Sequence, residues 1–310
     1  MNKISNRQII CDTLIKLSKE DKDIMVVTCD SRGSASMENF ANEFPEQFVE
    51  VGIAEQDAVG IAAGLATCGK KPYVTSPASF LSMRSVEQIK VDVAYSKTNV
   101  KLIGISGGVS YGALGMTHHS LQDIAVIRAI PGIAVLIPAD RFETKKMIEA
   151  FQKYNKPAYI RIGRNAVEDV HENENFEFEI GKANLLHEGN DITIIATGET
   201  VKAALDASKE LETNGIGCRV LSMHTIKPLD EEVIIKAANE TKGVITIEEH
   251  SIYGGLGAAV SEVVCQTTPT KMKILAIADE APVTGNTKEV FNYYGLTAEN
   301  LVKVAKEMLK

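Results

Sequence analysis

Cysteine is scarce in this sequence, and none of it is arranged to bind a metal. The five cysteines, at positions 11, 29, 68, 218 and 265, include no C-x-x-C pair. Such scattered cysteines are typical of a reducing cytoplasm and exclude a disulfide framework and a cysteine-based zinc site. We therefore expect a cytoplasmic protein whose chain contributes no metal ligands.

Long apolar segments and an excess of positive charge are also missing. No apolar run reaches the length of a membrane span, and the N-terminal MNKISNRQII lacks the apolar core of a signal peptide. The 41 acidic residues outnumber the 33 Lys and Arg, which gives a net charge of −8. Nucleic acid and membranes are therefore not expected as partners, although a few local arginines can still hold a small anionic substrate.

The 310 residues are enough for two medium-sized domains. In the first half, apolar runs expected to be strands alternate with stretches of helical periodicity, a pattern typical of a parallel sheet covered on both faces. The expected strands lie at 24–28, 47–51, 72–75, 100–106, 133–137 and 158–162. The expected helices lie at 6–18, 54–68, 83–95, 120–129 and 142–153.

A change of composition divides the chain. The segment AVEDVHENENFEFEIGKANL is acidic and weakly periodic, which is typical of a surface linker, and a second α/β series follows it. Strands are expected there at 191–197, 218–222, 244–248 and 272–276. The predicted fold is therefore α/β with two domains, each a mostly parallel sheet flanked by helices, at 1–167 and 188–310, joined by a linker at 168–187.

The segment 49–66, VEVGIAEQDAVGIAAGLA, contains a single buried-looking acid. Glu55 stands at the first turn of an expected helix, where the helix dipole favours a carboxylate. The small residues that follow allow another backbone to approach closely. From spacing alone, a helix-capping acid beside a packed helix is the favoured explanation of Glu55, because acids at helix N-termini are common.

The phrase V-G-I-A-E-Q-D-x-V-G-I-A-A-G-L-A resembles the pyrimidine-binding domain of the transketolase family. In that family this glutamate contacts N1′ of the aminopyrimidine of thiamine diphosphate, so the resemblance implies that Glu55 activates this cofactor. Asp30, in TCDSRGS, falls where the family has an acid near the cofactor. Phe80, in SPASFLSMRS, falls where an aromatic ring packs on the pyrimidine, and Met83 takes the next cradle position.

The run THHSLQDIAVIRAIPGIAVLIPAD resembles a second family phrase, in which His118 takes the place of the substrate-proximal histidine. The family grips a sugar phosphate with two arginines and a serine, for which the candidates are Arg7, Ser34 and Arg164. Guanidinium groups suit phosphate because they donate paired hydrogen bonds and stay charged.

Other interpretations of these positions remain open at this stage. Arg32 and Arg161 lie close enough in sequence to be the phosphate ligands instead, and Arg7 is equally compatible with a solvated surface residue. In the second domain, Glu248 and Glu249 are adjacent on an expected strand and should face opposite sides, which argues against a metal site.

Two positions depart from the transketolase pattern. Leu114 stands where the family's G-E-D-G aspartate contacts a hydroxyl of the sugar donor, and Ser106 replaces a histidine that also contacts the donor. A site without these hydrogen-bond partners should not prefer the same substrate. We therefore expect an atypical ketose donor, for example one branched at C3.

No G-D-G occurs in the chain. In the family this motif, followed by an asparagine, holds the diphosphate through a divalent metal in a separate domain. The resemblance therefore implies the C-terminal subunit of a split transketolase, active only with an N-terminal subunit that carries G-D-G…N and holds most of the Mg²⁺ or Ca²⁺ site. It further implies an α2β2 heterotetramer that moves a two-carbon ketol unit from a ketose phosphate to an aldose phosphate (EC 2.2.1.-).

Three alternatives stay open. The β subunit of a 2-oxo acid dehydrogenase E1 component and a deoxyxylulose phosphate synthase-like enzyme share the expected architecture. A non-catalytic partner subunit belongs to a different class, and the acid at Glu55 argues against it because a structural subunit does not need one there.

Overall fold

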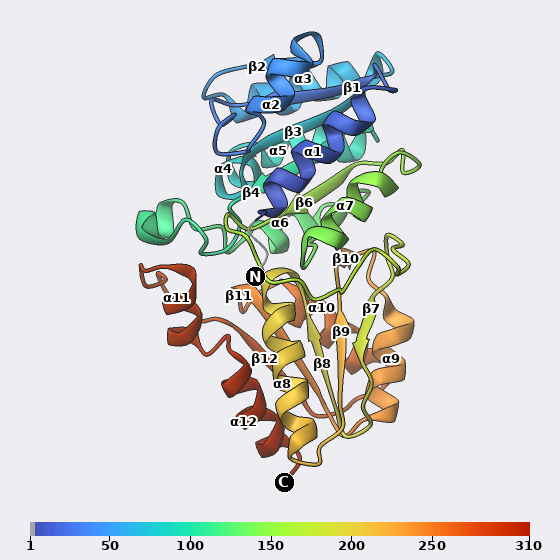
Figure 1. The fold of residues 1–310 in the computed structure, drawn as a ribbon, viewed down its shortest axis with the longest axis vertical. Helices are drawn as coiled ribbons and strands as arrows, with labels where there is room; N and C mark the ends of the chain where they lie inside the picture. Colours follow the sequence, from blue (N-terminus) through green and yellow to red (C-terminus); the bar gives the residue numbers. More distant parts are fainter. Residues whose placement is uncertain (1–3) are drawn as a thin grey trace.

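A computed structural model describes residues 4–310 and contains two α/β domains stacked end to end (Figure 1). The first sheet has the strand order β10-β5-β6-β4-β3-β1-β2, and only the β5–β10 pair is antiparallel within the described chain. Its strands are β1 (Ile24–Thr28), β2 (Phe48–Glu50), β3 (Lys71–Pro77), β4 (Lys101–Ile105), β5 (Ala134–Leu136), β6 (Ala158–Arg161) and β10 (Thr225–Lys227).

Helices cover both faces of this sheet, as its apolar strands require. They are α1 (Asn6–Ser18), α2 (Glu38–Glu43), α3 (Glu55–Thr67), α4 (Ala78–Arg84), α5 (Val86–Gln88), α6 (Asp123–Ala129) and α7 (Arg141–Ala150). Shorter or wider turns are η1 (Pro45–Gln47), the π-helical η2 (Ile89–Tyr95) and the 3-10 segment η3 (Gly112–Thr117), which projects from the side of the molecule (Figure 1).

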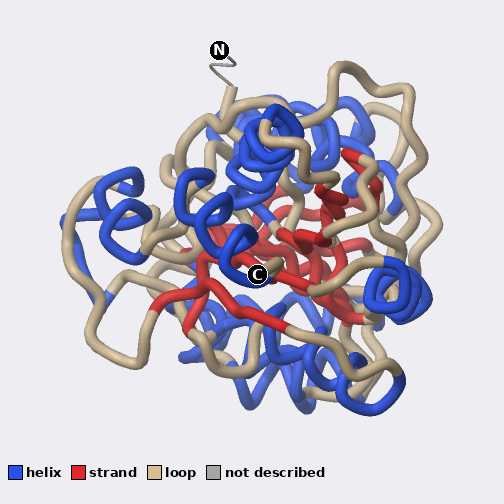
Figure 2. The backbone as a smooth tube through the Cα atoms, turned by 90° about the horizontal axis from the view of Figure 1, so that it is seen from below, coloured by secondary structure: helices blue, strands red, loops and turns tan. Residues whose placement is uncertain are grey.

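The second sheet has the order β12-β11-β8-β9-β7, and its β7–β9 pair is the antiparallel one among the described residues. Its strands are β7 (Asn184–His187), β8 (Ile192–Ala196), β9 (Cys218–Ser222), β11 (Val244–Ser251) and β12 (Met272–Ile277). The helical elements are η4 (Gly198–Thr200), α8 (Val201–Thr213), α9 (Glu231–Glu240), α10 (Leu256–Thr267), α11 (Thr287–Tyr294) and α12 (Ala298–Met308). Seen from below, helices lie on both sides of the strands (Figure 2).

The predicted fold class is confirmed, and two strands, β1 and β9, have the predicted bounds. The helix expected at 83–95 is wrong as a single element. Ser85 has the non-helical angles φ −107° and ψ 17°, so α4 ends at Arg84 and a wider π turn follows from Ile89. The helix expected from 120 begins at Asp123, whose preceding residues form a bridge and bends instead.

Two strands cross the predicted division of the chain. β10 comes from the second half but pairs with β5 of the first sheet, with Thr225 opposite Leu136. The last residues of the predicted linker form β7, which pairs with β9. The segment 162–183 between the two series contains no helix or strand.

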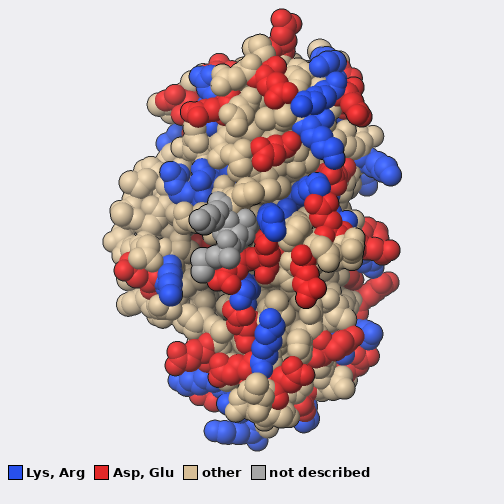
Figure 3. All heavy atoms as spheres, in the orientation of Figure 1, with Lys and Arg blue, Asp and Glu red and all other residues tan. Residues whose placement is uncertain are grey.

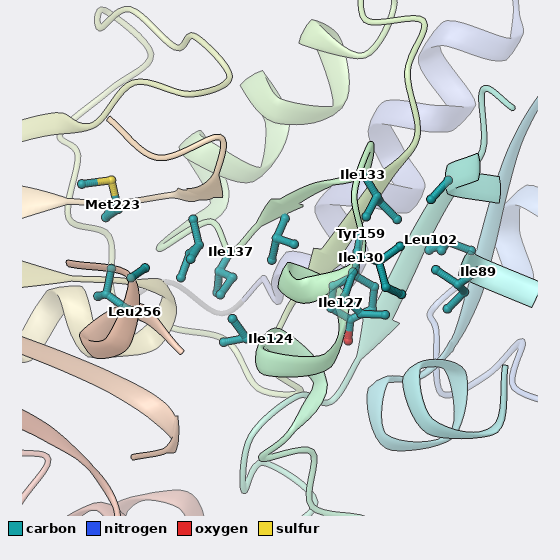
Figure 4. Packing of buried hydrophobic residues seen from close by; sticks show 14 of the residues in the cluster. Ile89, Leu102, Ile124, Ile127, Ile130, Ile133, Ile137, Tyr159, Met223 and Leu256 are labelled. Carbon is teal, nitrogen blue, oxygen red and sulfur yellow. The ribbon is translucent and has the colours of Figure 1, made fainter. Parts of the chain in front are cut away.

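The hydrophobic core continues from one domain into the other. Met223 and Leu256 of the second half belong to the same buried cluster as Ile124 and Ile137 of the first, and Figure 4 shows these side chains side by side. Because burial of apolar area is the main driving force of packing, this shared cluster and β10 hold the two domains together as one unit.

The visible surface carries acidic and basic side chains interspersed, without a broad basic patch (Figure 3). No helix among the described residues is both long and apolar enough to cross a bilayer.

Candidate active site

The predicted site residues follow the carboxyl ends of neighbouring parallel strands. Asp30 comes after β1, Glu55 after β2 and Phe80 after β3, while Ser106 follows β4 and Arg164 follows β6. These strands are adjacent and parallel in the sheet, so their carboxyl ends share one edge. Ligands of open α/β sheets bind at this edge.

Glu55 is the first residue of α3 and is only 5% exposed. The turn between β2 and α3 uses Gly52 at φ +74°, which an L side chain adopts only with strain. A hollow of about 490 Å³ lies in front of the helix start, lined by Ile53, Ala54, Glu55, Gln56, Asp57 and Arg84. The chain therefore presents a nearly buried carboxylate at the bottom of a small open cavity.

Arg84, at the end of α4, is the ion-pair partner of Glu55. Its Nη1 lies 3.0 Å from both carboxylate oxygens, and its guanidinium carbon lies 4.0 Å from the centre of the Phe80 ring. Sequence reasoning missed Arg84. The available signal was its spacing of four residues from Phe80, which places both on one face of α4.

His118 joins Phe80 to a second aromatic ring that was not predicted, Tyr111. The His118 ring centre lies 5.1 Å from that of Phe80 and 5.3 Å from that of Tyr111, both edge to face. Nδ1 of His118 lies 3.0 Å from the hydroxyl of Thr117. The predicted catalytic histidine and the predicted cradle ring are therefore in direct contact, although they are 38 residues apart in sequence.

The three predicted phosphate ligands also come together. Arg7 donates from Nε and Nη2 to the carbonyl of Arg164, at 3.0 and 2.6 Å, and from Nη1 to the carbonyl of Ser34. Burial and the charge of Arg164 lower the pKa of Arg7. The Arg164 guanidinium lies 5.1 Å from the Tyr111 ring, and its Nη1 is buried without a hydrogen-bond partner among residues 4–310.

This geometry gives the two arginines different uses. Arg7 donates its hydrogen bonds to backbone carbonyls and thereby connects the N-terminal helix α1 to the loops that carry Ser34 and Arg164. Arg164 keeps an unsatisfied donor beside Tyr111, which is the arrangement that an anionic group completes.

The remaining cofactor candidates, Asp30 and Met83, are not among the residues that line the hollow. Asp30 is exposed, has φ +52°, and donates its backbone N–H to Glu50 at 2.7 Å. Met83 is 51% exposed and precedes Arg84 in α4. A non-glycine residue with positive φ is uncommon, and such residues cluster at functional sites.

The two donor-specificity positions differ in burial. Ser106 is fully buried at φ +55°, and its hydroxyl has no hydrogen-bond partner within the described chain. Leu114 is 53% exposed on η3, as is Met116 at 59%. Close backbone approaches, such as Gly112 against Gly285, hold η3 against the segment before α11.

Arg161, the alternative phosphate ligand, forms ion pairs between the two domains instead. Its side chain is buried, with Nε 3.4 Å from Asp123 and Nη2 3.5 Å from the carboxylate of Glu249, and it donates to the Glu249 carbonyl at 2.6 Å. Burial raises the pKa of Glu249 to about 8 and that of Glu199 to about 7, while Arg161 lowers both. This ionic cluster connects β6 of the first domain with β11 of the second.

The neighbouring acid Glu248 faces the other way and accepts the N–H groups of Leu256 and Gly257 at the start of α10, at 2.7 and 2.8 Å. The predicted alternation of Glu248 and Glu249 is confirmed. Within residues 4–310 no group of three or more His, Cys, Asp and Glu side chains is placed to hold a metal ion.

The residues around the hollow fit an aminopyrimidine. They offer a nearly buried carboxylate as hydrogen-bond partner and an aromatic face beside it. Arg84 contacts both groups, since its planar guanidinium donates to Glu55 and lies against the Phe80 ring. The carboxylate and the aromatic ring, both in contact with Arg84, are the groups that the pyrimidine end of a cofactor needs.

Comparison with known proteins agrees with this assignment. Residues 2–169 match the transketolase pyrimidine-binding domain, and residues 181–301 match the transketolase C-terminal domain. The chain is 54% identical over 309 residues to an apulose-4-phosphate transketolase subunit of Phocaeicola vulgatus, covering 100% of this chain and 99% of that protein. It is 36% identical over 302 residues to the 6-deoxy-6-sulfo-D-fructose transketolase subunit SqwH of Clostridium sp. strain MSTE9, covering 97% and 94%.

A solved structure of a split gene transketolase, described as an inactive β4 tetramer, is similar to the whole chain. The TM-score is 0.90 at 35% identity, and the match covers 99% of both chains. The predicted resemblance is confirmed. The chain therefore belongs to the transketolase family, whose cofactor is thiamine diphosphate, and corresponds to the subunit of a split transketolase that carries the pyrimidine-binding and C-terminal domains.

Proposed function

We propose that this chain is the C-terminal half of a two-chain glycolaldehyde transferase that is active only with an N-terminal subunit, as a cytoplasmic α2β2 heterotetramer. The observation that carries the proposal is the nearly buried carboxylate of Glu55, which lines an open hollow and is connected through Arg84 to the Phe80 ring. The partner would supply the G-D-G…N motif, the Mg²⁺ or Ca²⁺ site and the second wall of the hollow.

Glu55 would hold and exchange the proton at N1′ of the aminopyrimidine. Phe80 and Met83 would pack on its ring, and Asp30 would lie at the rim. Thiamine diphosphate supplies, when bound, the electron sink that lets a carbon–carbon bond beside a ketone break. The protein's share is orientation, exclusion of water and placement of protons.

The sugar would lie between His118 and Arg164. The contact of His118 Nδ1 with Thr117 leaves Nε2 for a substrate hydroxyl, where it can hold or move a proton. Arg164, with its unsatisfied Nη1, would bind the phosphate together with the Ser34 hydroxyl. Arg7 would act through Arg164, whose carbonyl it holds.

The donor is proposed to be an atypical ketose phosphate. Leu114 and Ser106 replace the two polar contacts that the family makes with its donor, and the relatives at 54% and 36% identity are named for different sugars. Apulose 4-phosphate, from the name of the former relative, is the first donor to assay. Xylulose 5-phosphate is the reference, and turnover as efficient as that of an ordinary transketolase would refute an atypical preference.

The test is a calorimetric titration of thiamine diphosphate with Mg²⁺ into this chain, into the N-terminal subunit and into their complex. Binding is expected only in the complex, and Glu55→Gln should lower ketol-transfer kcat by roughly 10²–10⁴-fold, the range of general acid–base catalysis. Asp57→Asn is the matched control, since Asp57 lines the same hollow two residues further along the first turn of α3.

Other outcomes separate the alternatives. Tight cofactor binding by this chain alone would contradict the split site, and no binding in any pairing would favour a non-catalytic subunit. Release of CO₂ from pyruvate without ketol transfer would favour the E1 β-subunit or deoxyxylulose phosphate synthase-like reactions.

A further inference from the structure

Arg84 touches the two groups that the proposed function assigns to the aminopyrimidine. Its Nη1 is 3.0 Å from both oxygens of Glu55, and its guanidinium lies 4.0 Å from the centre of the Phe80 ring. Glu55 and Phe80 belong to different elements, α3 and α4, so a single side chain bridges the two halves of the pocket.

A guanidinium group resembles an aminopyrimidine ring in shape and in hydrogen bonding. Both are planar, both stack on an aromatic face, and both form in-plane hydrogen bonds with a carboxylate. They cannot use the same contacts of Glu55 at the same time. We infer that Arg84 occupies the place of the aminopyrimidine in the cofactor-free subunit and leaves Glu55 when thiamine diphosphate binds. This inference rests on the proposed function.

The Arg84 side chain can move away from the ion pair, whereas the Glu55 side chain is held in place by burial. The Arg84 side chain is 47% exposed and that of Glu55 is 5% exposed. Arg84 is the last residue of α4, and the non-helical Ser85 follows it, so its side chain can turn outward without disturbing a helix interior. Until then it neutralises a nearly buried carboxylate that would otherwise lack a charged partner, which is costly in a folded protein.

The expected consequence is a lowered apparent affinity for the cofactor. When only a fraction of molecules has a free binding site, the apparent Kd rises by the reciprocal of that fraction. An ion pair formed in roughly 80–97% of molecules would therefore weaken binding about 5- to 30-fold. The same pair stabilises the cofactor-free subunit, so cofactor affinity and subunit stability are coupled in opposite directions.

The experiment uses the assembled complex with Mg²⁺ and compares wild type with Arg84→Met in a calorimetric titration of thiamine diphosphate. Met keeps most of the length and removes the charge and the donors. The matched control is Arg141→Met, because Arg141 also pairs with a carboxylate, at 3.0 Å from Asp169, and lies 4.3 Å from an aromatic ring, but does not line the hollow. Arg84→Met should bind about 5- to 30-fold more tightly and Arg141→Met within about twofold of wild type.

Thermal unfolding of the isolated subunit gives a readout independent of activity. Arg84→Met should lower the Tm of the cofactor-free subunit, and Arg84→Met combined with Glu55→Gln should restore much of it, since the neutral amide needs no cation. Arg84→Lys, which keeps the charge but not the planar donor face, serves if the Met variant does not fold, and should also bind the cofactor more tightly than wild type.

The outcomes are distinguishable. Unchanged or weaker binding by Arg84→Met, in a complex whose wild type binds thiamine diphosphate, would overturn the inference and leave the proposed function intact, because Arg84 would then orient Glu55 in the loaded site. Failure of the wild-type complex to bind thiamine diphosphate would overturn both.

Discussion

Removal of the Arg161 guanidinium should destabilise the whole chain, because Arg161 is the cation at the centre of a buried ionic cluster between the two domains. Its side chain is 4% exposed and lies 3.4 Å from Asp123 and 3.5 Å from Glu249, whose side chains are 0% and 5% exposed. Breaking a buried pair by removing one partner typically costs about 3–5 kcal/mol. Arg161→Leu should therefore lower the urea midpoint of the chain by roughly 1–2 M.

A second substitution at Glu249 separates the effect of the lost charge from the effect of lost packing, because only the charge effect depends on pH. The pKa of Glu249, about 8 in the fold, lies above the ordinary value of 4.5. The folded state therefore binds the extra proton, and stability falls as pH rises from about 4.5 to about 8. Arg161 lowers this pKa, so its removal extends the interval to higher pH, and the rescue by adding Glu249→Gln to Arg161→Leu should grow with pH, by at most about 1.4 kcal/mol per pH unit.

Urea unfolding at pH 5.5, 6.5 and 7.5, followed by circular dichroism, measures both quantities. Arg141→Leu, which breaks a more exposed ion pair with Asp169, is the control and should cost no more than about 1 kcal/mol. A loss below about 1 kcal/mol for Arg161→Leu, or a rescue that does not change with pH, would refute the electrostatic reasoning.

Two further substitutions test other parts of the fold and site. Burial opposes ionisation of Glu143, but its hydrogen bond with His171 and its other charged and polar partners outweigh burial and lower its pKa to about 2. The ionised Glu143 therefore contributes its full stabilisation of the fold above about pH 4.5, and that contribution disappears as pH falls towards 2. Between pH 5 and pH 3 the wild type should lose roughly 2 kcal/mol through this group, and Glu143→Gln should lack that loss in urea unfolding; an equal loss in both proteins would contradict this origin. Leu114→Asp should raise kcat/KM for xylulose 5-phosphate by about tenfold or more in the assembled complex, whereas Met116→Asp, on the same exposed η3, should not; equal effects of both changes would separate donor choice from position 114.

The relation between sequence and site differs from residue to residue. Glu55, Phe80 and His118 were predicted from extended phrases, and the structure brings Phe80 and His118 into contact. Tyr111 and Arg84 were missed because the partners that define their roles, His118 and Glu55, belong to other segments; the spacing of Arg84 from Phe80 was the one local signal. Arg161 and Arg164 could not be separated by sequence, since they are three residues apart, but β6 ends at Arg161, which points into the domain interface, while Arg164 lies in the loop beside Tyr111.

By itself the sequence determined the local structure and the family. Alternating apolar strands and helices specify a mostly parallel α/β architecture, because each such strand must be covered on both faces. The phrase around Glu55 is long enough to identify the pyrimidine-binding domain.

The tertiary structure alone decided the contacts between distant segments. These include the pairing of β10 with β5, the ion pair of Arg161 with Glu249, and the ion pair of Glu55 with Arg84, 29 residues away in the chain. The physical reason is that secondary structure follows from interactions a few residues apart, whereas the partner of a buried charge depends on which strand ends and helix termini the fold brings to the same place.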